Sequence, residues 1–289
     1  MRALPAFTEH RIPRLDGYLY ARDYAGTGPA FVLMHGFPDH LGVYDELVPH
    51  LVAAGRHVVT FDFLGFGRSD KTSGATYDFH QQLGDLQTVA DALELVSFIP
   101  VAHDASGPTA INFCIDHPAR VASLCLMNSA YDDAQPILWP ELISLFAEPR
   151  LRALSQAIAQ SPSQFGWLLG WQAPRFAVNL PTDLQAHFEG VTGKLIADNF
   201  IVQPSSGPAF VQLAADFFPE LARNTKRLPQ VAALEIPVKV IWGALDPYIT
   251  ADVARAHASH FKHASLHLLD GGHWIQSDRP ADVAREMLS

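Results

Sequence analysis

The sequence predicts an α/β protein with a mostly parallel sheet of eight strands, helices on both faces and an inserted helical segment. Short apolar runs alternate with amphipathic helical patterns over most of the 289 residues, which is typical of a parallel sheet covered by helices. This alternation stops between Asn128 and Pro237, where helical patterns broken by prolines follow one another. A third observation is a strand-to-helix junction rich in small residues around Asp104.

The expected strands are short and rich in β-branched and apolar residues. In chain order they cover residues 9–13, 18–23, 31–35, 57–62, 97–102, 122–128, 238–242 and 265–269. We expect the first two to form a hairpin-like edge of the sheet.

The interruption in the pattern divides the chain. Residues 1–131 are predicted to form the first part of a sheet core, residues 132–230 a helical cap, and residues 231–289 the second part of the core. Ligands of open α/β sheets bind beyond the carboxyl ends of the strands, so the cap is expected to cover such a site.

Composition excludes several kinds of partner. The formal net charge is −10, without long charged blocks, which argues against binding to nucleic acid or to an anionic membrane. No apolar run approaches the roughly 20 residues that span a bilayer. The first residues lack the pattern of a signal peptide. We expect a cytoplasmic monomer or homodimer that acts on a hydrophobic small molecule.

The cysteines and histidines give no sign of a metal or of disulfides. Cys114 and Cys125 lie in apolar segments, where buried free thiols are expected. None of the 14 histidines has an i, i+4 partner supported by a carboxylate. The sequence therefore predicts no metal site, and nothing in it calls for a cofactor.

The junction at Asp104 has the pattern of a nucleophile elbow, small-x-nucleophile-x-small, between an apolar strand and a helix. Such a turn lifts one side chain above the sheet in an uncommon backbone conformation. Asp104 is the expected nucleophile. If Ser106 were the nucleophile, Asp104 and Pro108 would occupy positions that need small residues. A polar strand end without a catalytic role is the other alternative.

An aspartate nucleophile needs a base to activate water and a group to orient that base. His273 follows the last expected strand after two glycines, and an imidazole suits this task near neutral pH. Asp246 follows the preceding strand and is the expected orienting acid. Asp132 and Asp133, after the sixth strand, are an alternative source of this carboxylate.

Backbone N–H groups are expected to stabilise the oxyanion. One is the N–H of Ala105, directly after the nucleophile. The other is the N–H of Phe37, in the loop after the third strand, where Gly36 permits a tight turn and Pro38 has no N–H to offer. The glycines of residues 62–70 lack the spacing of a phosphate-binding loop, so that segment is predicted to be a structural turn.

Four segments together resemble the α/β-hydrolase superfamily: HGFPDH, DFLGFGRSD, AHDASG, and GALDPY followed by GGHW. They cover the core, and an Asp at the elbow resembles the branch that contains epoxide hydrolases and haloalkane and fluoroacetate dehalogenases. The resemblance implies the α/β-hydrolase fold. It also implies an alkyl-enzyme ester on Asp104, hydrolysed by water that His273 activates with the help of Asp246.

The chain departs from each of these subfamilies. Ala105 stands where haloalkane dehalogenases carry Trp and fluoroacetate dehalogenases carry Arg. Residues 132–230 contain no Tyr, although epoxide hydrolases use two cap tyrosines to protonate the epoxide oxygen. The residues that we expect to line the substrate pocket are Tyr131, Trp139, Trp171, His187 and Tyr248.

The favoured interpretation is a hydrolase that opens an epoxide to a diol. A haloalkane or haloacid dehalogenase is the first alternative, with cap indoles holding the halide. A non-hydrolytic ligand-binding protein on the same scaffold is an alternative of another class. An esterase would require Ser106 to act as nucleophile.

Overall fold

The computed structural model describes residues 3–133 and 137–289; residues 134–136, which fall within the predicted cap, and residues 1–2 lie outside the described residues. It contains an eight-stranded sheet with the order β1-β2-β4-β3-β5-β6-β7-β8. The strands are β1 (Thr8–Arg14), β2 (Gly17–Tyr24), β3 (Thr27–Met34), β4 (Arg56–Phe61), β5 (Phe98–Asp104), β6 (Leu124–Ser129), β7 (Val238–Gly243) and β8 (Ala264–Leu269).

The pairing of the strands confirms the predicted architecture. β1 and β2 form an antiparallel hairpin at one edge, and β2 also runs antiparallel to β4. From β4 through β3 and β5 to β8, every neighbouring pair is parallel. All parallel strands therefore end at the same edge of the sheet, which brings the loops that follow them together.

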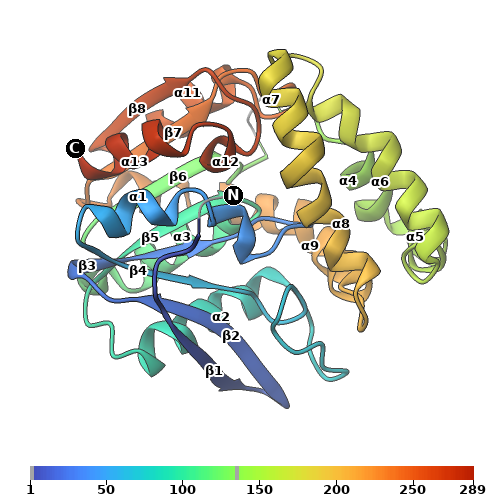
Figure 1. The fold of residues 1–289 in the computed structure, drawn as a ribbon, viewed down its shortest axis with the longest axis horizontal. Helices are drawn as coiled ribbons and strands as arrows, with labels where there is room; N and C mark the ends of the chain where they lie inside the picture. The colour runs from blue at the N-terminus through green and yellow to red at the C-terminus, as the bar shows by residue number, and fades with distance from the viewer. Residues whose placement is uncertain (1–2, 134–136) are drawn as a thin grey trace.

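Helices cover both faces of the sheet, and this explains why the central strands are apolar on both sides. Residues 98–103 of β5, for example, are all buried. α1 (Val48–Ala53) and α13 (Pro280–Leu288) contact each other on one face, and α2 (Phe79–Ala92) packs beside α3 (Ser106–Asp116) on the other (Figure 1). α11 (Ala251–Ser259) packs on β7 and β8, and α12 (Ile275–Asp278) directly precedes α13.

Between β6 and β7 the described chain is helical, and we call its helices α4 to α10 the helical insertion. They are α4 (Glu141–Ala147), α5 (Arg152–Ala159), α6 (Pro162–Phe176), α7 (Thr182–His187), α8 (Gly193–Ile201), α9 (Gly207–Thr225) and α10 (Leu228–Ala232). Those from α4 to α9 gather at one side of the molecule, yellow-green to orange in Figure 1. Short helical turns are η1 (Leu41–Tyr44), η2 (Pro118–Arg120), η3 (Pro149–Leu151) and η4 (Phe188–Thr192).

Several prolines of the insertion mark helix starts. Pro162 and Pro208 lie in the first turns of α6 and α9, where the missing N–H would have no intrahelical partner. Cys114 and Cys125 are free and buried, as predicted. Within the described ranges, no helix combines the length and apolar character needed to cross a bilayer.

Candidate active site

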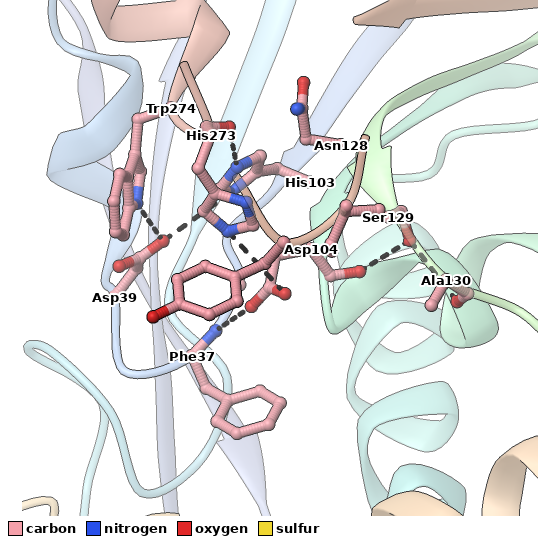
Figure 2. A network of polar contacts seen from close by, with 12 residues as sticks. Phe37, Asp39, His103, Asp104, Asn128, Ser129, Ala130, His273 and Trp274 are labelled. Carbon is pink, nitrogen blue, oxygen red and sulfur yellow. Dashed lines mark hydrogen bonds and ion pairs between the residues drawn. The ribbon is translucent and has the colours of Figure 1, made fainter. Parts of the chain in front are cut away.

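Asp104 is the last residue of β5, and α3 begins two residues later at Ser106. Its backbone φ is +52°, the uncommon conformation expected of an elbow. The pairing of β5 with β6 shifts register between His103 and Asp104, so the elbow leaves the regular ladder at this residue. Ser129, at the end of β6, donates a hydrogen bond of 2.6 Å to the Asp104 carbonyl (Figure 2).

Ser106 lies beneath the turn. Its hydroxyl accepts a hydrogen bond from the His103 N–H at 2.9 Å and lies 2.9 Å from the carbonyl oxygen of Met34, to which it donates. The residue is fully buried and is not among the described residues that line the cavity next to Asp104. This placement disfavours the alternative in which Ser106 is the nucleophile.

The loop after β3 holds one oxygen of the Asp104 carboxylate. The N–H of Phe37 donates to Oδ2 of Asp104 at 3.0 Å. His35 fixes this loop, since its Nε2 accepts from the N–H of Phe63 and its Nδ1 therefore donates to the Gly36 carbonyl at 2.6 Å. Within the described residues, no hydrogen bond joins the N–H of Ala105 to this carboxylate.

Gly36 leaves room for the nucleophile, because a Cβ atom there would lie 2.6 Å from both Cβ and Oδ2 of Asp104. We expect Gly36→Ala to displace the carboxylate and lower kcat by about 10²-fold, the cost of a misplacement near 1 Å. Turnover and the unfolding temperature of both proteins should be measured together. Unchanged turnover in the folded variant would contradict this arrangement.

His273 and Asp246 form the expected pair. Nδ1 of His273 lies 2.7 Å from Oδ2 of Asp246, and its Nε2 faces Oδ1 of Asp104 at 3.8 Å. Oδ2 of Asp246 also accepts from Nδ2 of Asn128 at 2.9 Å, and Oδ1 accepts from the N–H of Tyr248 at 2.9 Å. Because the carboxylate accepts a hydrogen bond from Nδ1–H and so fixes the proton on that nitrogen, Nε2 is the nitrogen that can act as the base.

Asp132, the alternative orienting acid, lies elsewhere: its Oδ2 is 2.9 Å from Nε2 of His260. The loops that carry Asp246 and His273 approach closely at glycines. A Cβ on Gly243 would lie 1.8 Å from the carbonyl oxygen of Gly272. This approach requires glycine at position 243.

A second imidazole and carboxylate lie beside the first pair. Nε2 of His103 is 2.9 Å from the backbone oxygen of His273, to which it donates. Its Nδ1 faces Oδ2 of Asp39 at 3.6 Å, and the same oxygen accepts from the indole N–H of Trp274 at 2.9 Å (Figure 2). These contacts anchor the backbone of the His273 loop to the loop after β3.

The charges of the site shift its pKa values. Burial raises the pKa of Asp104, although His273 and His103 oppose this effect. Burial alone would lower the pKa of His273, but the charge and hydrogen bond of Asp246, together with the charges of Asp104 and Asp39, raise it to about 9. Burial also acts to raise the pKa of Asp246, yet His273 holds it below its ordinary value.

We expect the pKa of His273 to depend on the charge at Asp104. A pKa of about 9 leaves the base protonated at neutral pH. Removing the charge of Asp104, as in Asp104→Ala, removes one of the charges that raise this pKa, so it should fall. NMR titration of the imidazole in both proteins measures the change. The same pKa in both would contradict the coupling.

The raised pKa of His273 also links pH to stability. Its value of about 9 in the folded protein exceeds the roughly 6.5 of an unperturbed histidine. The resulting stabilisation is complete below about pH 6.5 and is lost as the pH rises through about 9.

A cavity of about 500 Å³ opens onto Asp104 and His273. Most of its wall is apolar and comes from the helical insertion. Lining residues include Phe37, Trp139, Leu142, Ile143, Leu169, Phe176, Phe188, Ile196, Phe200, Phe217, Tyr248 and Trp274. Among the described lining residues, Lys194 is the only lysine or arginine.

Two of the expected pocket residues reach this cavity, Trp139 and Tyr248. The other three do not line it. The hydroxyl of Tyr131 donates to Asn112 at 2.9 Å, and Nε2 of His187 contacts the hydroxyl of Ser277 at 2.8 Å. Trp171 is covered by the guanidinium of Arg175. The neighbouring residue Gln172 lines the cavity instead, because successive helical residues point in different directions.

Sequence reasoning missed Asp39, His103, Asn128 and Ser129. His103 and Asp39 stand beside Asp104 and His40 in the segments AHDASG and HGFPDH, where their burial could not be read from the sequence. Buried polar groups need partners. Asn128 has a positive φ of 31°, which no sequence pattern predicted. Among the described residues, no group of three or more His, Cys, Asp or Glu side chains could hold a metal ion.

Comparisons with known proteins agree with this geometry. A family model described as alpha/beta hydrolase fold matches residues 29–280. The chain is similar to haloalkane dehalogenase 2 of Mycobacterium tuberculosis, with 24% identity over 271 residues that cover 91% of this chain and 88% of that protein. It is 26% identical to epoxide hydrolase B of the same species over 332 aligned positions, which cover 90% of each chain.

The fold is also similar to that of a solved structure, the epoxide hydrolase CorEH without ligand. The TM-score is 0.77 at 19% identity, and the match covers 98% of each chain. The strand order, the elbow after β5 and the residues matched by the family model lead to one conclusion. The chain belongs to the α/β-hydrolase fold family and is a hydrolase.

Proposed function

We propose that this protein opens epoxides to diols through an ester formed on Asp104. The observation that carries the proposal is that the two carboxylate oxygens of Asp104 have different surroundings. Oδ2 is held by the Phe37 N–H at 3.0 Å, while Oδ1 faces His273 at 3.8 Å and an apolar cavity. A carboxylate held in this way attacks through Oδ1, with Oδ2 becoming the carbonyl oxygen of the ester.

In the first step, Oδ1 of Asp104 bonds to a saturated ring carbon, and the bond from that carbon to the epoxide oxygen breaks. The oxygen needs a proton. We assign its donation to Tyr248, whose hydroxyl accepts from Nε2 of Gln172 at 2.8 Å and donates to Oε2 of Glu141 at 2.9 Å. On attack, this O–H turns from Glu141 to the epoxide oxygen. Burial, then the contact with Glu141, raises the pKa of Tyr248 to about 12, so the phenol keeps its proton at neutral pH.

In the second step, His273 takes a proton from water, and the resulting hydroxide attacks Cγ of Asp104. Negative charge develops on Oδ2, next to the N–H of Phe37. The bond between Cγ and Oδ1 then breaks, and Oδ1 leaves as the second hydroxyl of the diol with the proton that His273 took from water. The carboxyl group left on Asp104 carries an oxygen from water, and its proton returns to the Tyr248 phenolate, so the carboxylate and the phenol are both regenerated.

The lining of the cavity favours an uncharged, largely apolar substrate. Lys194 is on the exposed surface of α8, and no lysine or arginine among the described lining residues adjoins Asp104. A substrate carboxylate would therefore enter an apolar cavity without a nearby guanidinium or ammonium group.

Carbon–halogen hydrolysis is the second candidate. Trp139 lines the cavity, and its indole N–H has no acceptor among the described residues, so it suits a departing halide. A protein that only binds ligands needs no orienting carboxylate behind a histidine. The contact of 2.7 Å between Asp246 and His273 therefore argues against that alternative.

Product analysis tests the proposal. The purified protein is incubated with a panel of apolar epoxides and a panel of haloalkanes, and diol and halide are measured. Diol formation without halide release is expected. Halide release without diol would replace epoxide opening by dehalogenation. Esterase activity alone, with no ester on Asp104, would contradict both.

A further inference from the structure

Asn199, on α8, joins the helical insertion to two core loops through all of its side-chain polar groups. Its Nδ2 donates to the backbone oxygens of Pro38 at 2.6 Å and Asp39 at 2.7 Å. Its Oδ1 accepts from the N–H of Gly67 at 2.9 Å and lies 3.4 Å from the hydroxyl of Ser206. The side chain is 5% exposed. Two carbonyls need donors and one N–H needs an acceptor, so a side-chain amide suits this position.

The two carbonyls that Asn199 holds belong to the loop that contacts the nucleophile. Directly before them, the N–H of Phe37 donates to Oδ2 of Asp104. The side chain of Asp39 accepts from Trp274, next to His273 in the chain. Asn199 therefore holds the loop between its contact with Asp104 and its contact with Trp274.

The helix that carries Asn199 also forms part of the cavity wall. Lys194, Ile196, Ala197 and Phe200 of α8 line the cavity. A substrate that packs against this wall would therefore contact the helix that is hydrogen-bonded to the Phe37 loop. This side chain therefore joins a helix of the cavity wall to the loop that carries the expected oxyanion donor.

We propose that Asn199 is a positioning residue for ester hydrolysis, which holds the Phe37 N–H against the Asp104 oxygen where negative charge develops. The inference rests on the proposed function of Asp104. Charge leaves the carboxylate when the ester forms and returns to Oδ2 when water attacks. A displaced donor therefore slows hydrolysis more than it slows ester formation.

The test separates these two steps. Asn199→Asp keeps the size and the acceptor atoms but loses both donors to Pro38 and Asp39. Rapid-quench intact mass spectrometry during turnover of an epoxide follows ester on Asp104, with Asn199→Ala as a second variant. We expect hydrolysis of the ester to slow by about 10-fold or more. Removing a whole oxyanion donor lowers kcat by about 10²–10³-fold, and a displaced donor should lose part of that effect. Ester formation should change by less than about threefold, so ester accumulates although His273 is intact.

Asn224 offers a matched control. It is a buried amide on α9, 1% exposed, and its Oδ1 accepts from Asn112 of α3 at 3.0 Å. Asn224→Ala therefore also removes a hydrogen bond between the insertion and the core, but one that does not involve the loop after β3. We expect no accumulation of ester in this variant. Equal slowing of both steps in Asn199→Asp, or the same accumulation in Asn224→Ala, would overturn the positioning role.

A second measurement needs no substrate. Hydrogen exchange at the Phe37 amide should become faster in Asn199→Asp and stay unchanged in Asn224→Ala. Unchanged exchange in Asn199→Asp would overturn the proposal. If the wild-type protein formed no ester with any substrate, the proposed function would fail, while the exchange result would still decide whether Asn199 holds this loop.

Discussion

His273→Gln is expected to form the ester on Asp104 but not to hydrolyse it, so the variant remains alkylated. The first step does not need His273, because it uses the carboxylate, which Phe37 still holds at 3.0 Å, and the proton of Tyr248. The second needs a base, and glutamine cannot accept the proton of water. We expect turnover to fall by about 10⁴-fold or more, as when a residue of a catalytic triad is removed. Intact mass after soaking with each substrate panel measures the ester.

The mass of the adduct also identifies the reaction. A gain equal to the whole epoxide means ring opening, and a gain equal to the alkyl group without halogen means dehalogenation. Peptide mapping should place the adduct on Asp104. As a control, His187→Gln changes a histidine outside the cavity lining and should give no lasting adduct. Rapid hydrolysis of the ester in His273→Gln would exclude His273 as the base.

The sheet and the elbow were predictable because they depend on local patterns. The apolar runs of the strands and the small residues around Asp104 are short-range signals. Every expected strand is present with ends shifted by a few residues, and β5 extends to Asp104 itself. Asp104, Asp246 and His273 follow in this order because they lie at the ends of β5, β7 and β8.

The surroundings of the nucleophile were less predictable because they depend on contacts between distant segments. Asn199 lies 161 residues from Pro38 along the chain, and neither sequence window contains a sign of the other. The same holds for Trp274 and Asp39, which are 235 residues apart. In the insertion, an error of one residue in predicting which face of a helix points to the cavity changes the result. Trp171 lies under Arg175, whereas its neighbour Gln172 lines the cavity.

Asp104→Ala should abolish ester formation as well as turnover, and this distinguishes the nucleophile from the groups that assist it. Alanine is preferable to asparagine because an amide at this position would remain exposed to water activated by His273, which could restore the carboxylate. We expect kcat to fall by about 10⁴-fold or more. Asp246→Asn should also turn over slowly, but it should still form the ester, since Asp246 contacts His273 and not the substrate.

The comparison of these two variants carries the argument. Mass spectra of both proteins after the same soak should show an adduct in Asp246→Asn and none in Asp104→Ala, with unfolding temperatures confirming that both are folded. An adduct on another residue in Asp104→Ala would show that this other residue, and not Asp104, is the nucleophile. Residual turnover in that variant close to the wild-type rate would mean that water attacks the substrate directly. The carboxylate at the elbow would then not be needed for the reaction.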